Sequence, residues 1–216
     1  MSDSVTYTGM IIKSAPLREY DKRLVLLTGE AGKITAFIRG ARKQGSKFMG
    51  TTEPFCFGEF KLIPGKDAYT LVDTNISRHF EELREDYDAM VLASYFLEIA
   101  DYYTRENMEA YKELNLIYAS ILAIISGRFN LKLIKCIYEI RSQVIAGEFP
   151  GIPVGRSFSE TAVYTVERIM KSELQNLYSF TVSDEVVVEL EYICEKTLNR
   201  GIDRQFNSVK LMDDKK

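Results

Sequence analysis

Basic residues gather in one stretch of this chain, in a pattern that suits the binding of a polyanion. No acidic residue occurs between Glu30 and Glu53, whereas five basic residues do. Lysine and arginine neutralise phosphates, and an aromatic ring beside them can stack on a base. A solvated hairpin, whose charges only confer solubility, explains the same pattern equally well. The residues that would contact a nucleic acid are Lys33, Phe37, Arg39, Arg42, Lys43 and Lys47.

The first half of this stretch alternates as a β-strand does. A strand is expected over residues 33–39, followed directly by the basic part of the stretch. Gly40, Gly45 and Gly50 lie there among small and basic residues, which predicts a mobile loop. The side chains of the strand would divide into a core face and a solvent face: Ile34, Ala36 and Ile38 on the first, and Lys33, Thr35, Phe37 and Arg39 on the second.

Four other short strands are expected near this one. A tight turn at residues 29–32 would join the second strand to the third, and Ser14 to Pro16 would end the first. Five short strands within the first 80 residues favour a five-stranded oligonucleotide-binding (OB) barrel. The expected strands are residues 6–13, 23–28, 33–39, 55–63 and 69–73.

The spacing of apolar residues changes to that of helices after residue 80. Residues 81–147 contain no proline, and three helices are expected there, the third capped by Asn130. Two further helices are expected over residues 159–170 and 183–198, the latter opened by Ser183. The predicted fold class is therefore α+β, with an OB-fold nucleic-acid-binding domain at residues 1–80 and an all-helical bundle at residues 81–216.

Charge is unevenly divided along the chain, whose formal net charge is -3. Residues 1–80 carry 12 basic and 8 acidic residues, whereas residues 81–216 carry 16 and 23, so the net charges are +4 and −7. A nucleic-acid face is therefore expected in the N-terminal part. The N-terminus lacks the features of a signal peptide, and no apolar run reaches the roughly 20 residues of a membrane span. We expect a cytoplasmic, nucleoid-associated protein with no membrane contact.

Residues that could catalyse a reaction are sparse. His79 is the only histidine, so histidine-rich metal sites are excluded and a Ser–His–Asp triad lacks support. The segment GEAGKIT at residues 29–35 lacks the first glycine and the Ser or Thr of a phosphate-binding loop. Cys56, Cys136 and Cys194 lie far apart in the sequence and predict neither a disulfide framework nor a zinc motif. We expect a binding protein rather than an enzyme, with no metal and no cofactor.

A second basic group lies in the helical part, where acidic residues otherwise prevail. At spacings of four and three residues, its cations would line one face of the third helix beside apolar side chains. Such a face suits an acidic, apolar peptide tail, and it equally suits a solvated helix surface. The residues predicted for this partner contact are Arg128, Leu131, Lys132 and Lys135, with Ile134 adjacent.

Several segments, taken in order, resemble the RecO family of bacterial recombination mediators. The densest match is RGARKQGS at residues 39–46, which is similar to the family's glycine-alanine-arginine loop that ends in serine. The similarity extends to the helical run at residues 87–125 and to RQFNSVKLM at residues 204–212. The other matching segments are residues 9–14, 21–28 and 32–43, Ser46 and the pair Pro54-Phe55.

The resemblance implies an N-terminal OB barrel and a C-terminal helical domain. It implies binding to single- and double-stranded DNA and annealing of complementary strands. It also implies help to RecR in loading the RecA recombinase onto DNA coated by single-strand DNA-binding protein. The acidic C-terminal tail of that coating protein would dock on the helical domain.

The chain departs from the family pattern at two places. Many members carry four zinc-binding cysteines after the third helix, but residues 149–159 contain none, so no zinc is expected there. Gly45 stands where many relatives have a basic residue, so one phosphate contact would be missing.

Two other functions remain open from the residues alone. An OB barrel can also bind RNA, which a titration of DNA against RNA would reveal. Alternatively, the basic face could recruit an acidic protein as part of an interaction scaffold, and salt-dependent binding to DNA would then be absent.

Overall fold

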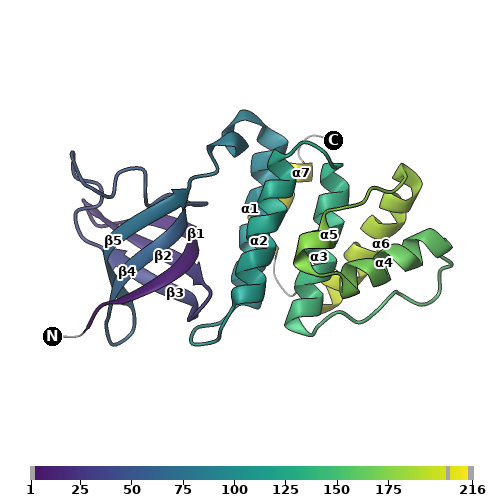
Figure 1. Cartoon of the computed structure of the whole chain (residues 1–216), viewed down its shortest axis with the longest axis horizontal. Coiled ribbons are helices and arrows are strands. Elements are labelled where there is room, and N and C mark those ends of the chain that lie inside the picture. Colours follow the sequence, from purple (N-terminus) through teal and green to yellow (C-terminus); the bar gives the residue numbers. More distant parts are fainter. Residues whose placement is uncertain (1–2, 203–204, 214–216) are drawn as a thin grey trace. The chain divides into compact units, whose positions relative to one another are not determined.

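The computed structural model describes residues 3–202 and 205–213. Of Asp213 it describes the backbone only. The chain forms two compact units (Figure 1). The first contains Met1–Glu81 together with Ala100–Leu114, and the second contains Glu82–Ile99 together with Asn115–Lys216. The first unit therefore holds the strands and also a segment from the helical part of the sequence.

The strands of the first unit form a closed barrel (Figure 1). Their order around the barrel is β1-β2-β3-β5-β4, in which β3 and β5 pair in parallel and all other neighbours are antiparallel. This confirms the predicted fold class, an OB-fold barrel followed by helices. The strands are β1 (Val5–Leu17), β2 (Asp21–Thr28), β3 (Gly32–Ile38), β4 (Phe57–Pro64) and β5 (Tyr69–Arg78).

Three strands are longer than predicted, and β2 differs least, because it only begins two residues earlier, at Asp21. β1 does not end at Ser14 to Pro16 but continues to Leu17, because its second half pairs with β2 as far as the Leu17–Asp21 pair. A register shift between Ile11 and Lys13 separates this half from the first, which pairs mainly with β4. β5 continues to Arg78 because β4 pairs with it along its whole length.

The core of the barrel follows the predicted alternation in β3. Ile34, Ala36 and Ile38 are buried in one cluster with residues of the other strands. Ala41 and Phe48, from the segment after β3, are buried in the same cluster. The basic loop at residues 39–56 is therefore a packed segment rather than the mobile coil that its glycines suggested.

The turn between β2 and β3 packs against the connection between two helices. This turn joins β2 and β3 into a hairpin, and the Thr28 hydroxyl donates to the carbonyl of Gly32 at 2.9 Å. Gly32 has φ 67°, and a Cβ there would overlap the carbonyl oxygens of Arg105 and Met108. Glycine is therefore required by the backbone conformation and also by the close approach of residues 105–108.

One buried carboxylate joins this helical segment to two strands. Asp101, whose side chain is 8% exposed, forms ion pairs with Lys13 of β1 at 2.7 Å and with Lys33 of β3 at 3.1 Å. The Lys33 ammonium also donates to the backbone carbonyl of Asp101 at 2.6 Å. The last turn of α1 (Tyr87–Tyr103) is thus fixed to the outside of the barrel.

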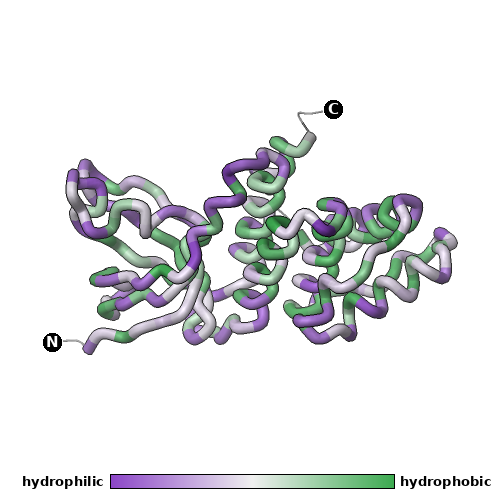
Figure 2. The backbone as a smooth tube through the Cα atoms, turned by 45° about the horizontal axis from the view of Figure 1, so that its top comes forward, coloured by the Kyte–Doolittle hydropathy of each residue, from purple (hydrophilic) through white to green (hydrophobic). Residues whose placement is uncertain are grey.

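The second unit is helical, and hydrophobic and hydrophilic residues are interspersed along its chain (Figure 2). Asn130 caps α3 by accepting from Lys132 N, as predicted, and Ser159 caps α4 by accepting from Ala162 N. Among the described helices, none is long and apolar enough to cross a bilayer. After the short 3₁₀ turn η1 (Glu81–Glu85) and α1, the helices are α2 (Tyr111–Ile125), α3 (Leu131–Ala146), α4 (Glu160–Lys171), α5 (Leu174–Leu177), α6 (Asp184–Gly201) and α7 (Asn207–Asp213).

The Asp101 ion pairs generate a stability prediction. Asp101→Asn should lower the free energy of unfolding by about 2 kcal/mol, because it removes a charged acceptor from two lysines, one of which is 24% exposed. Denaturant unfolding measures the change. The matched control is Asp73→Asn, since Asp73 pairs with Lys47 on the surface, where the loss should be small. Equal losses in the two variants would contradict the structural role given to Asp101.

Candidate nucleic-acid interface

Phe37 is the exposed aromatic residue of β3. Its ring is on the solvent side of the barrel, and the residue is 37% exposed. Its neighbours across the sheet are Arg23 of β2 and Thr70 of β5, both exposed. Phe37 therefore has the exposure that stacking on a base requires.

Lys33 does not belong to this exposed surface. The residue lies at the other end of β3, where its ammonium is held by the carboxylate and the backbone carbonyl of Asp101. A nucleic acid would have to break a partly buried ion pair to use it. The prediction of Lys33 as a DNA contact is therefore not supported by its geometry, because a partner distant in sequence already neutralises it.

The four loop cations are all exposed, and their surroundings differ. Within the described part of the chain, the Arg39 guanidinium makes no hydrogen bond or ion pair. Arg42 donates to the backbone carbonyl of Glu19 at 3.2 Å, which leaves its charge uncompensated by any carboxylate in that contact. The Lys43 ammonium lies 5.7 Å from the centroid of the Tyr20 ring. These three cations are available to phosphates.

Lys47 is the loop cation with an acidic partner. Its ammonium lies 2.9 Å from the carboxylate of Asp73, and the two side chains are both well exposed. This hydrogen bond lowers the pKa of Asp73. Because water screens an exposed pair strongly, a phosphate can compete for Lys47 far more easily than for Lys33.

Contacts with β2 and the β1–β2 turn hold the basic loop in place. The amide of Gly40 donates to the Asp21 carboxylate at 2.9 Å, and the amide of Arg42 donates to the carbonyl of Tyr20 at 2.9 Å. Near the end of the loop, Lys22 pairs with Glu53 at 2.5 Å. The cations are therefore held close to β2 before any ligand arrives, which reduces the entropy lost on binding.

Two residues of this surface were missed by the reading of the sequence. Arg23 lies directly opposite Phe37, and the register needed to find it follows from the hairpin pair Thr28–Gly32. Tyr20 is 43% exposed, in the turn that contacts the basic loop. No periodic signal marks Tyr20, because it lies in a turn between strands.

The predicted row of cations on α3 is not a single face. Arg128 lies before the helix, which begins after its cap at Asn130. Its side chain lines a cavity of about 520 Å³ whose other walls are largely apolar. The lining residues include Leu122, Phe129 and Tyr178.

Lys132 and Lys135 line a different cavity, of about 600 Å³, and acidic residues accompany them. Lys132 lies 3.3 Å from Glu191, and Lys135 lies 2.8 Å from Glu139, whose side chain is fully buried. Burial lowers the pKa of Lys135, but the Glu139 carboxylate outweighs burial and raises this pKa above its ordinary value. Leu131, the fourth predicted contact, is half-buried at the start of α3. Both lysines are thus compensated by glutamates of the same chain.

His79 lies where the sequence suggested, at the surface next to the barrel. Its Nδ1 is 3.5 Å from the Sγ of buried Cys56. A catalytic triad would add a carboxylate that orients the histidine, and the contact described for His79 is with a thiol.

Comparison with known proteins gives consistent similarities along the chain. The family model for "Recombination protein O N terminal" matches residues 1–80, which contain all five strands. A "DNA repair protein RecO" from Clostridium novyi is 26% identical over 234 residues, covering 94% of this chain and 91% of the relative. The protein of the same name from Clostridium perfringens (strain 13 / Type A) is 28% identical over 234 residues, with coverage of 94% and 95%. Another from Acetivibrio thermocellus is 23% identical over 235 residues, with coverage of 94% and 93%.

The family match covers the barrel and its basic loop, and the similarity to the relatives continues through the helical unit. The closed five-stranded barrel is the fold that the resemblance implied. Together these findings show that the barrel matches the N-terminal domain of Recombination protein O (RecO) and that the chain is similar to RecO proteins along almost its full length.

Proposed function

We propose that this protein acts in recombinational DNA repair by binding single-stranded DNA on the barrel surface around Phe37 and the basic loop. The observation that carries the proposal is the exposed Phe37 ring, which lies opposite exposed Arg23 in β2 and is followed by the exposed cation of Arg39. Relatives named for DNA repair, similar along almost their full length, support the same role.

The surface supplies the two interactions that single strands need. Cations on the loop attract the phosphate backbone, and the Phe37 ring offers an apolar face to one base. Tyr20, beside Lys43, offers a second ring at the edge of the same loop. The strand would follow the loop from Tyr20 towards Phe37, with its phosphates near Arg39, Arg42 and Lys43.

Annealing of complementary strands follows from this mode of binding. Contacts to the phosphates and stacking on a ring do not depend on the base sequence. They also leave the hydrogen-bonding edges of the bases exposed for pairing. We infer that the barrel brings strands together by neutralising their phosphates. Help to RecR in loading RecA is the further step that the family resemblance implies, and it too belongs to the proposal.

We propose that the acidic tail of the single-strand DNA-binding protein binds in the 520 Å³ cavity that Arg128 lines in the helical unit. Arg128 is exposed and makes no ion pair among the residues that the structure describes. The apolar walls at Leu122 and Phe129 suit the apolar side chains of such a tail, and Arg128 suits its carboxylate. Of the four predicted contact residues, Arg128 is therefore the one that we propose as the principal contact.

The first test is the salt dependence of binding to a labelled single strand. About four phosphate contacts, at ~0.7 each, predict a slope of log affinity against log salt near −3. Replacing Arg39, Arg42, Lys43 and Lys47 together by alanine should flatten the slope strongly. Replacing Lys171 and Lys196, exposed cations of the helical unit, should leave it unchanged. A slope that survives the fourfold change would place the DNA elsewhere, and a clear preference for RNA of the same length would favour an RNA-binding role.

The second test separates stacking from simple apolar contact at Phe37. Phe37→Leu should weaken binding to single strands by roughly 1–3 kcal/mol, because it removes the ring, whereas Phe37→Tyr should retain most of the affinity. The melting temperatures of both variants should stay near that of the parent, since the side chain faces solvent. Full affinity in Phe37→Leu would exclude stacking.

The third test concerns the tail. A peptide with the acidic, apolar character of the tail should bind to the parent protein, and Arg128→Glu should weaken it at least tenfold, because the variant replaces the attraction for a carboxylate by repulsion. Lys132→Glu is the matched control, since Lys132 is already compensated by Glu191. Amidation of the peptide's terminal carboxylate should reproduce the Arg128→Glu loss. A loss confined to Lys132→Glu would move the docking surface to the larger cavity.

A further inference from the structure

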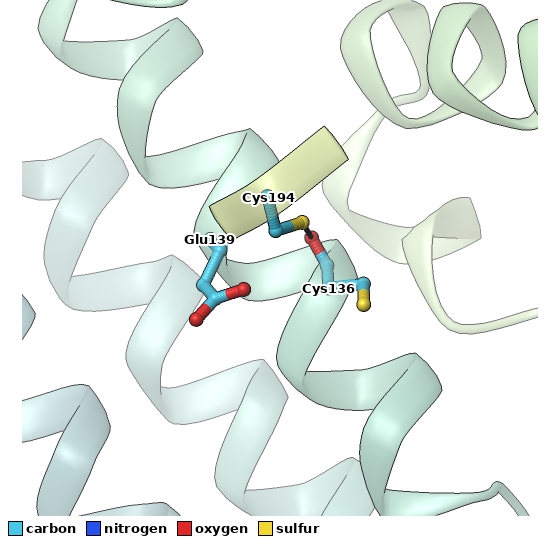
Figure 3. Close-up of side chains that lie close together, drawn as sticks. All are labelled: Cys136, Glu139 and Cys194. Atoms are coloured by element: carbon cyan, nitrogen blue, oxygen red, sulfur yellow. Dashed lines mark hydrogen bonds between the residues drawn. The ribbon is translucent and has the colours of Figure 1, made fainter. Parts of the chain in front are cut away.

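Three buried side chains with metal-binding atoms lie close together in the helical unit (Figure 3). Cys136 and Glu139 come from α3, and Cys194 comes from α6. Their ligand atoms all lie within 4.8 Å of one another. The two cysteines are far apart in the sequence, which is why spacing alone gave no indication of a zinc motif.

Only one of the two carboxylate oxygens of Glu139 has a hydrogen-bond partner among the described residues. Its Oε1 accepts from the Tyr95 hydroxyl at 2.6 Å and from the Lys135 ammonium at 2.8 Å. Its Oε2 is buried and has no hydrogen-bond partner among the described residues. An orphaned buried oxygen is rare and calls for a bound ion or water. A cation between Oε2 and the two sulfurs would supply the missing partner.

The dimensions of the cluster suit a small divalent ion. Three atoms no more than 4.8 Å apart allow an ion at their centre to lie within 4.8/√3, about 2.8 Å, of each. Zinc bonds are near 2.3 Å to thiolate and 2.0–2.2 Å to carboxylate. Each ligand atom would therefore have to move roughly half an ångström towards the ion to reach bonding distance. The Cys194 Sγ would exchange its weak 3.7 Å contact with the Cys136 carbonyl for a bond to the metal.

The charges of the cluster also balance around a divalent ion. Two thiolates and one carboxylate carry three negative charges, while the ion and the Lys135 ammonium carry three positive charges. The contacts of Oε1 with Tyr95 and Lys135 would orient the carboxylate from behind, as outer partners of metal ligands do. Glu139 also lines the 600 Å³ cavity, which gives an ion and a ligating water a route of entry.

We propose that Cys136, Glu139 and Cys194 form a zinc site that ties α3 to α6. Thiolates with one carboxylate favour zinc over the harder ions calcium and magnesium. On binding, each cysteine forms an S–Zn bond and loses its thiol proton to solvent. No electron is transferred in this step. Because both thiols release a proton when they bind zinc, zinc affinity should fall as the pH is lowered.

The experiment uses the full chain, purified, stripped with a chelator and titrated with zinc against a chromogenic chelator. One equivalent of zinc should bind, and it should raise the melting temperature. Cobalt in place of zinc should give the near-ultraviolet charge-transfer band of thiolate ligation. Absence of both stoichiometric zinc and the cobalt band would overturn the proposal.

The chain provides its own matched control for the cysteines. Cys136→Ala and Cys194→Ala should each abolish the cobalt band, whereas Cys56→Ala should keep it, although all three thiols are buried. Glu139→Gln should lower zinc affinity at least tenfold, because the amide is a poor ligand. Retention of parental zinc affinity in Cys136→Ala and Cys194→Ala would exclude the site.

A second measurement uses the parent protein and therefore remains informative if the variants fail to fold. In the parent protein at mild denaturant concentration, zinc should slow alkylation of Cys136 and Cys194, and the modified residues can be identified by mass spectrometry. Cys56 in the barrel should show no comparable protection. Zinc that leaves the alkylation of both helical cysteines unchanged would contradict the proposal even without variants.

Discussion

Closure of the barrel by β1 is the constraint on which the first unit depends. This strand pairs with β4 through its first half and with β2 through its second, and the register shift near Ile11 lets it serve both neighbours. A closed sheet has one inside, so every strand must alternate apolar and polar positions in step with the others. The outward direction of Phe37 is therefore dictated by the burial of Ile34, Ala36 and Ile38.

Cations of the barrel divide into those that hold the structure and those that are left for a ligand. Lys22 and Lys33 have acidic partners and are mostly buried, so they fasten the basic loop and the helical segment to the strands. Arg39, Arg42 and Lys43 project from the fastened loop without an acidic partner in the described contacts. The first group gives the second a fixed position, and a count of basic residues in the sequence does not distinguish the two groups.

Strand alternation and helix spacing were enough to predict the barrel, its helical continuation and the outward ring of Phe37, because these patterns are local. The partner of Lys33 could not be predicted, since Asp101 lies 68 residues away. Glu191, the partner of Lys132, is likewise 59 residues away, whereas Glu139 lies one helical turn from Lys135 on α3 and was within reach of the sequence. Arg23 was within reach of the sequence, because a four-residue turn sets the register of its hairpin.

The segment Ala100–Leu114 has a consequence for how this protein can change through evolution. It packs on the closed barrel although it lies outside the stretch that encodes the strands: Asp101 pairs with two lysines, and residues 105–108 lie against Gly32. A gene fragment that ended after the last strand would leave Lys13 and Lys33 without the Asp101 carboxylate, and it would expose the turn at Gly32. Shuffling of this barrel into another protein would therefore have to carry part of the helical region with it, so the two halves are expected to be inherited together.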